Sequence, residues 1–170
     1  TAGDFASTVL SPTVPGYEAF DLNDQKKFPQ GQPDKAKAIL QKAGKMGMSV
    51  VYGYANTPKG QEGSVVVKAG LEKAGFKVVL KPIDPKNFYD VIGKVNNQFD
   101  IYNGGWGADW PSAGTVIPPT LDGRKISDGS PNYEHFNDPT IDAESDRISL
   151  ETDLEQAAKD WGALDKKIME

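Results

Sequence analysis

A chain of 170 residues and 18.4 kDa is long enough to form one domain with a sizeable core. Apolar residues make up 38% and charged residues 25% of the sequence, a balance that excludes wholesale disorder. No apolar run approaches the roughly 18 residues of a membrane-spanning helix, and the N-terminal part has no basic segment followed by an apolar one. The sequence therefore predicts no membrane span, while a processed secreted protein remains open.

Charge is unevenly distributed along the chain. Residues 1–99 contain 13 Lys and 9 acidic residues, whereas residues 100–170 contain 6 Lys and Arg and 15 acidic residues. The acidic second half disfavours nucleic acid as a partner and favours a cationic ligand, although a solvated acidic helix face explains it as well. With no Cys and a single histidine, His135, the sequence excludes disulfides, thiolate zinc sites, Cys nucleophiles and His-cluster metal sites.

The chain is expected to begin with an extended lead-in segment. Residues 1–33 carry four prolines and show no periodicity, and an α/β domain is predicted to follow over residues 34–170. The first helix is predicted over residues 34–43, because apolar residues recur at helical spacing from Ala36 and because Gly44 can end it in a left-handed conformation.

Strand and helix signals then alternate. Strands are predicted at residues 49–54, 76–81 and 100–103, and helices over residues 61–74 and from Asp84-Pro85 onward. This alternation predicts two right-handed βαβ units and a short parallel core sheet flanked by helices.

Residues 104–136 show no regular periodicity, so they are expected to form a long loop. Four aromatic residues argue against disorder there: Trp106, Trp110, Tyr133 and Phe136. Two helices are predicted to close the chain, one over residues 139–149 and another with a capping box of Thr152 and Glu155 and an apolar stripe starting at Leu154.

Ligands of open α/β sheets collect beyond the carboxyl ends of the parallel strands. Three segments qualify, namely residues 54–61, 82–86 and 104–112. In the last, glycines allow another backbone to approach, tryptophan rings offer flat apolar walls, and Asp109 offers a carboxylate for an ammonium group. The candidate ligand-binding residues are Gly104, Gly105, Trp106, Gly107, Asp109 and Trp110.

Other interpretations of these residues are open. Trp106 can be a core plug and Asp109 a turn residue before Pro111. Carboxylates of the second half can also form a glycosidase pair, drawn from Asp109, Asp122 and Asp128. A third set is spaced four residues apart on one helical face, as a divalent-cation site can be: Asp138, Asp142 and Asp146.

Five segments in register resemble one family, the family 5 extracellular solute-binding proteins, which are the peptide/nickel-type receptors of ABC importers. Residues 11–17 are similar to its Pro-Gly-Tyr crossover segment, and residues 33–44 to its Lys-Ala-Lys helix that ends in Ala-Gly. The other three segments match its helix-to-strand passage, its Phe-Asp and Gly-Trp-x-Ala-Asp signature, and its Asn-Tyr and Asn-Asp-Pro pattern: residues 71–78, 99–111 and 132–142.

The resemblance implies one lobe of a type II periplasmic-binding-protein-like fold. It implies that Asp109 pairs with the terminal ammonium of a peptide and that Gly105, Trp106 and Gly107 line the groove. Trp110 stands where Tyr or Asn is commoner, which leaves the charge argument unchanged. Because family members also bind nickel chelates, sugars or other cations, the expected ligand is a short peptide or another small cationic solute.

The resemblance covers only the second lobe of such receptors, so this chain is expected to be an excised or trimmed lobe that binds peptides very weakly or not at all by itself. It further implies an ABC permease as membrane partner and a lipid-anchored extracellular or periplasmic location, with no cofactor, metal or enzymatic activity. The competing hypotheses are a hydrolase acting through paired carboxylates and an interaction module that uses the Trp-rich loop as a partner surface.

Overall fold

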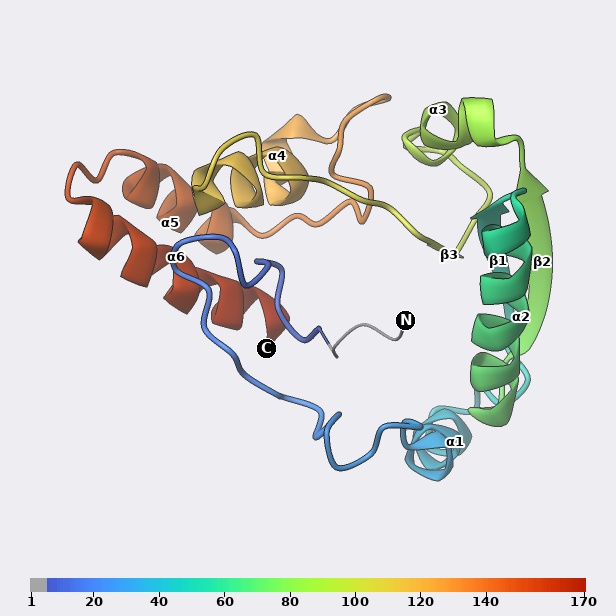
Figure 1. Ribbon diagram of the computed structural model, residues 1–170. Helices are drawn as coiled ribbons and strands as arrows, with labels where there is room; N and C mark the ends of the chain where they lie inside the picture. Colours follow the sequence, from blue (N-terminus) through green and yellow to red (C-terminus); the bar gives the residue numbers. More distant parts are fainter. Residues whose placement is uncertain (1–5) are drawn as a thin grey trace. The chain divides into compact units, whose positions relative to one another are not determined.

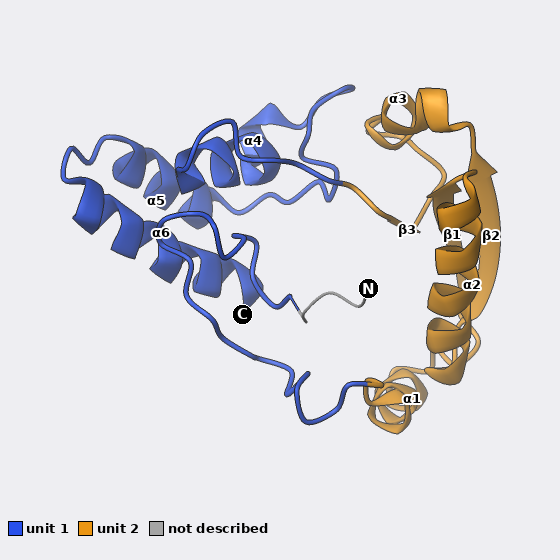
Figure 2. Cartoon of the chain, in the orientation of Figure 1, with its two compact units in different colours: residues 1–29, 105–170 blue, residues 30–104 orange. Residues whose placement is uncertain are grey.

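Two units of different secondary structure form the described part of the chain. The computed structural model describes residues 6–170 (Figure 1), so residues 1–5 of the predicted lead-in lie outside the described residues. One unit consists of residues 30–104, and the other combines residues 6–29 with residues 105–170 (Figure 2). By its contacts, the described lead-in segment up to residue 29 therefore belongs with the C-terminal part of the chain.

The unit of residues 30–104 is an α/β unit built on a parallel sheet with the strand order β2-β1-β3. A helix precedes the sheet, a long helix connects the first two strands, and a short helical turn connects the last two, as the bounds show: α1 (Pro33–Lys42), β1 (Ser49–Ala55), α2 (Pro58–Lys73), β2 (Lys77–Ile83), η1 (Pro85–Asn87), α3 (Phe88–Ile92) and β3 (Ile101–Tyr102). The predicted α/β class and parallel sheet are confirmed.

The small core of this unit lies between α2 and the sheet (Figure 1). Val50, Tyr52 and Val78 are buried there, and Val67 and Leu71 of α2 pack against them. The predicted stripe of α2 thus faces the sheet, whereas that of α1 does not. α1 lies fully within the described residues and contains no buried residue, and Ile39 is 60% exposed. Local periodicity placed this helix correctly but did not predict the contacts of its apolar face.

A side chain holds β3 to β1 where backbone pairing is short. The β1–β3 ladder contains only two residue pairs. Just before it, the Asp100 carboxylate accepts the Val51 N–H at 2.7 Å, and the Asp100 N–H donates to the Val51 carbonyl at 2.9 Å. The Phe99 ring covers Gly53, where a Cβ would lie 2.8 Å from the ring. The Phe-Asp pair therefore fixes the strand that leads into the candidate binding loop.

The second unit is helical. α5 and α6 pack against each other, and their apolar residues, among them Trp161 of α6, form one core with Leu10 and Ile117. The expectation of a long loop over residues 104–136 is wrong in part, because three short helical segments lie within it. They have three to five residues each, too few to produce a helical period in the sequence. The elements of this unit are η2 (Ala113–Thr115), α4 (Ile117–Leu121), η3 (Gly123–Lys125), α5 (Pro139–Ser149) and α6 (Leu154–Met169).

The cap of α6 differs from the prediction. Asp153, not Thr152, is the N-cap residue, and its carboxylate accepts the N–H groups of Glu155 and Gln156 at 2.9 and 3.1 Å. Both residue types suit an N-cap, and a carboxylate is stabilised further by the helix dipole. Because the helix begins at Leu154, this residue lies at the helix end and is 83% exposed rather than part of the buried stripe.

The lead-in segment is tied to α6 by a buried carboxylate. Asp165 is 1% exposed and accepts the N–H groups of Val9 and Leu10 at 2.8 and 3.1 Å. Burial raises the pKa of Asp165, and these two hydrogen bonds partly offset the rise. Gly16 faces the backbone of Ala158 so closely that a Cβ would collide with the Ala158 carbonyl. The part of the segment between Val9 and Gly16 therefore packs on α6.

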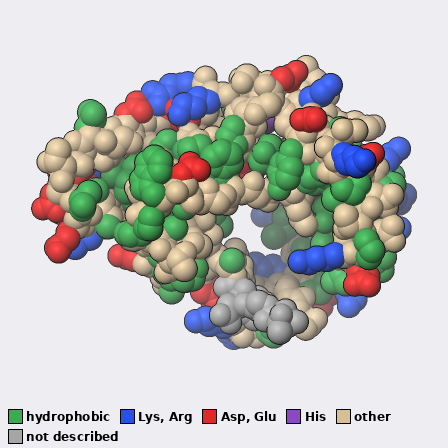
Figure 3. Space-filling view, turned by 45° about the horizontal axis from the view of Figure 1, so that its top comes forward, with side chains coloured by type: hydrophobic (Ala, Val, Ile, Leu, Met, Phe, Trp, Pro, Cys, Tyr) green, Lys and Arg blue, Asp and Glu red, His purple; other side chains and the backbone are tan. Residues whose placement is uncertain are grey.

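The two units carry opposite net charge. Residues 30–104 contain eleven Lys and six acidic residues, whereas residues 6–29 and 105–170 contain eight Lys and Arg and seventeen acidic residues. Figure 3 shows several acidic side chains along the outer edge of the helical unit. None of the helices between residues 6 and 170 is long and apolar enough to cross a bilayer.

Candidate functional site

The α/β unit contains a cavity at the carboxyl edge of its sheet. The cavity has a volume of about 610 Å³, within the range of small-ligand sites. It is lined by the end of β1, the start of α2, the segment after β2 and Asn103, which directly follows β3. Of the three segments predicted to collect a ligand, residues 54–61 and 82–86 both contribute to the wall of this cavity. The third, residues 104–112, does not, but Asn103 directly before it does.

The start of α2 is shaped by its cap and by one glycine. The Thr57 hydroxyl accepts the Gly60 N–H at 3.0 Å, and Pro58 occupies the first turn, where its missing N–H has no cost. A Cβ at Gly60 would collide with the Ala55 carbonyl. Glycine at this position therefore allows the first turn of α2 to approach the end of β1.

Aromatic rings form much of the cavity wall. The rings of Tyr52 and Tyr54 are 6.2 Å apart between centroids, and those of Phe88 and Tyr89 meet edge to face at 5.4 Å. The Tyr52 side chain is 2% exposed and is hydrogen-bonded to the Asn103 side chain. Burial raises the pKa of the Tyr52 phenol, and the bond to Asn103 partly offsets this, so the phenol stays neutral at physiological pH.

The predicted binding loop is divided between the units. Gly104 ends the α/β unit, and residues 105–110 belong to the helical unit. There the indole Nε1–H of Trp106 donates to the Thr115 carbonyl at 2.8 Å, and the Thr115 hydroxyl donates to the carbonyls of Ser112 and Trp110 at 2.8 and 3.3 Å. Buried Thr115 thus holds both ends of the loop.

The two tryptophans and Asp109 face solvent in this unit. Trp106 is 45% exposed and Trp110 is 64% exposed, so the alternative in which Trp106 plugs the core is wrong. Asp109 is exposed, and its carboxylate forms no ion pair with any residue between 6 and 170. Such a carboxylate is free to pair with an external cation.

The Arg124 side chain is the cation that pairs with the acidic residues Asp122 and Asp146. Its guanidinium forms bidentate bonds to Asp122 at 2.8 and 3.0 Å and to Asp146 at 2.7 and 2.8 Å. These bonds lower the pKa of both carboxyls. Buried Asp142 accepts the Gly123 N–H at 3.1 Å, and Asp138 caps α5. Within residues 6–170 no group of three acidic residues or histidine is placed to hold a metal ion, and Asp138, Asp142 and Asp146 each bond to other groups of the chain.

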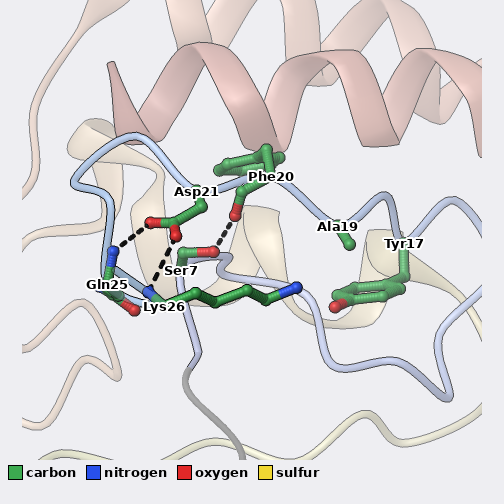
Figure 4. A pocket seen from close by; sticks show the side chains of 7 residues that line it. All are labelled: Ser7, Tyr17, Ala19, Phe20, Asp21, Gln25 and Lys26. Carbon is green, nitrogen blue, oxygen red and sulfur yellow. Dashed lines mark hydrogen bonds between the residues drawn. The ribbon is translucent and has the colours of Figure 1, made fainter. Parts of the chain in front are cut away.

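A smaller cavity of about 350 Å³ lies in the lead-in segment, lined by Ser7, Tyr17, Ala19, Phe20, Asp21, Gln25 and Lys26 (Figure 4). The Asp21 carboxylate accepts the N–H groups of Gln25 and Lys26 at 2.8 and 3.1 Å, which lowers its pKa. The Ser7 hydroxyl donates to the Phe20 carbonyl. Because these groups bond to the backbone of the segment itself, they stabilise its turns.

Sequence comparison identifies the family. Residues 2–128 match the sequence pattern of the family described as "Bacterial extracellular solute-binding proteins, family 5 Middle". The chain belongs to this family. The family consists of solute-binding proteins and not of enzymes, so the expectation that the chain is not an enzyme is confirmed and the hydrolase alternative is wrong. No curated protein sequence matches the chain.

Solved structures confirm the fold of the chain. "Clavulanic acid biosynthesis oligopeptide binding protein 2" is 26% identical with a TM-score of 0.87, and the match covers 98% of this chain and 32% of that one. The dipeptide binding protein from Pseudoalteromonas sp. SM9913, in complex with Met-Leu, is 21% identical with a TM-score of 0.81 over 96% of this chain and 32% of that one. The oligopeptide-binding protein AppA from Bacillus subtilis, in complex with a nonapeptide, is 19% identical with a TM-score of 0.78 over 98% and 34%. The chain spans about a third of the length of each of these proteins.

Sequence reasoning missed part of the cavity. Phe88 and Tyr89 lie on α3, two and three residues beyond the predicted segment 82–86, and Asn103 lies one residue before the predicted loop. The sequence feature that could have predicted these three residues is their position, because each follows a parallel strand. Their proximity depends on how α3 returns to the sheet, which periodicity does not reveal.

Proposed function

We propose that this chain supplies part of the ligand-binding surface of a receptor that delivers short peptides to an ABC permease. In this proposal Asp109 pairs with the peptide's terminal ammonium, and the backbone of residues 104–107 and the tryptophan rings contact the peptide. Another small cationic solute would use the same carboxylate. The location that fits is the outer face of the membrane, with a lipid anchor, or the periplasm.

The observation that carries the proposal is the exposed Asp109 carboxylate, which has no ion-pair partner among residues 6–170, while Thr115 holds the loop around it in place. Other carboxylates in this unit cap a helix or pair with a cation, as Asp122, Asp138 and Asp153 do. Peptide complexes of the structurally similar proteins from Pseudoalteromonas and Bacillus support a peptide as the ligand.

The test uses nuclear magnetic resonance, because binding by the 170-residue chain is expected to be weak. An exposed ion pair contributes about 0.2–1 kcal/mol, and dissociation constants near or above about 1 mM are expected. Tri-alanine should shift the backbone amides of residues 105–110, and N-acetylated tri-alanine, which has no ammonium group, should shift them less.

Two variants make the test specific. Asp109→Asn should weaken binding of tri-alanine by up to about fivefold, to the level of the acetylated peptide. Glu134→Gln removes the same charge from another exposed loop position in this unit and should leave binding unchanged. Equal shifts with free and acetylated peptide in the wild type, or full binding by Asp109→Asn, would remove Asp109 from the site. Micromolar affinity would contradict the expected weak binding.

A further inference from the structure

The cavity at the carboxyl edge of the sheet has a different chemistry from the loop around Asp109. Four aromatic side chains line it, in two close pairs: Tyr52 with Tyr54, and Phe88 with Tyr89. The charged groups on its wall, Lys59 and Glu62, are both exposed and belong to the first turns of α2. A wall of this kind favours an apolar, flat group over a charged one, because rings stack on rings and bury apolar surface.

A polar pair accompanies these rings. The hydroxyl of Tyr52 is bonded to the side chain of Asn103, and both residues line the cavity. An Asn amide has two donor hydrogens and a carbonyl acceptor, so one bond to Tyr52 leaves it able to form another. The cavity therefore suits a phenyl ring and also a phenol ring, whose hydroxyl can bond to the amide.

The lack of a side chain at Gly63 affects the space that the cavity offers to such a ring. Gly63 lines the cavity, and a Cβ built on it meets no heavy atom within 4 Å. Unlike Gly60, whose Cβ would collide with the Ala55 carbonyl, Gly63 is not required by packing. Glycine inside a helix is unfavourable relative to alanine. The absence of a side chain at this position leaves the space beside α2 open.

We propose that this cavity receives an aromatic ring, phenyl or phenol, and that Gly63 is the residue that keeps it open to one. The inference goes beyond the proposed function and concerns the α/β unit alone: the ligand is a small molecule that carries such a ring. Gly63 is then a specificity-determining residue, since any larger side chain there would occupy the space of the ring.

The test uses a probe with neither an amine nor a peptide bond, so it is independent of Asp109. Binding of 4-methylphenol and of N-methylacetamide to the 170-residue chain is followed through backbone amide shifts. The phenol should bind at least about tenfold more tightly than the amide probe, and its shifts should centre on Gly60, Gly63 and Asn103. Equal binding of the two probes, or phenol shifts centred outside the cavity, overturns the proposal.

A cavity-filling variant and its matched control complete the experiment. Gly63→Trp should weaken phenol binding by at least about tenfold, because the new indole occupies the cavity. Gly70→Trp places the same residue in the same helix, also with no heavy atom within 4 Å of its Cβ and away from the cavity lining, and should change binding by less than about twofold. The indole of Gly63→Trp should also emit at a shorter wavelength than that of Gly70→Trp. Gly63→Leu, with a strong helix former, repeats the test if Gly63→Trp is misfolded. Unchanged phenol binding in a folded Gly63 variant overturns the proposal, whatever the peptide experiment shows.

Discussion

Removing one hydroxyl should loosen the Trp-rich loop without changing its shape. Thr115 is 4% exposed, and its hydroxyl donates to the Ser112 carbonyl at 2.8 Å and to the Trp110 carbonyl at 3.3 Å. Thr115→Val has nearly the same volume and removes only this donor. The backbone carbonyl of residue 115, which accepts the Trp106 indole N–H, remains in the variant.

The expected magnitude follows from the geometry. The Thr115 hydroxyl makes one bond of good length and a longer second one, and a net bond contributes about 0.5–1.5 kcal/mol. The Ser112 and Trp110 carbonyls can regain part of this from water, because Ser112 is half-buried and Trp110 is exposed. We expect the free energy of unfolding to fall by about 1 kcal/mol, and local opening of the loop to become about fivefold more frequent.

Hydrogen exchange of the Trp106 indole N–H measures this opening directly, and urea unfolding measures the global effect. Thr120→Val is the matched control, because the Thr120 hydroxyl donates to the Val116 carbonyl at 2.7 Å in the neighbouring helix, outside the loop. Exchange of the indole should rise in Thr115→Val and stay constant in Thr120→Val. Unchanged exchange in Thr115→Val, or an equal rise in both variants, would refute the role assigned to the hydroxyl.

Two further predictions concern stability. Gly53→Ala should lower the free energy of unfolding by about 1–3 kcal/mol, because the new Cβ would lie 2.8 Å from the Phe99 ring. Gly70→Ala should raise this free energy by up to about 1 kcal/mol, because its Cβ meets no heavy atom within 4 Å and alanine favours a helix over glycine. Urea unfolding that ranks the two variants in the opposite order contradicts this packing argument. Because Arg124 lowers the pKa of Asp122 in the folded state, the stability that this pair contributes is present above about pH 4 and is lost as the pH falls through the lowered pKa. The difference in urea midpoint between wild type and Arg124→Gln should therefore be constant near neutral pH and shrink below about pH 4, and a difference that persists at about pH 2 is the contrary result.

Features that depend on a few neighbouring residues could be predicted from the sequence. Gly44 ends α1 at φ +64°, and Asp84 caps η1 by accepting the Lys86 N–H. The alternation of strands and helices specified the parallel sheet, since consecutive parallel strands need a helical crossover between them. The cap of α6 was placed one residue early, because Thr152 and Asp153 both suit an N-cap and only packing selects between them.

The candidate site was predictable only in part. The Gly- and Trp-rich loop could be singled out by composition, yet the bond from the Trp106 indole to the Thr115 carbonyl joins residues nine positions apart. Likewise, the sequence grouped Asp138, Asp142 and Asp146 on one helical face. In the structure, Arg124, which is 22 residues from Asp146, pairs with that carboxylate.

The sequence by itself determined the local elements and the family, because caps, periodicity and motifs are encoded within a few consecutive residues. Only the tertiary structure decided which apolar faces are covered, which acidic residues have cationic partners, and that Tyr52, Gly63, Phe88 and Asn103 line one cavity. The physical reason is that most of these contacts join segments far apart in the sequence, as the pair of Arg124 and Asp146 does. The free energy that brings such segments together comes from tertiary packing, and a local sequence pattern does not specify it.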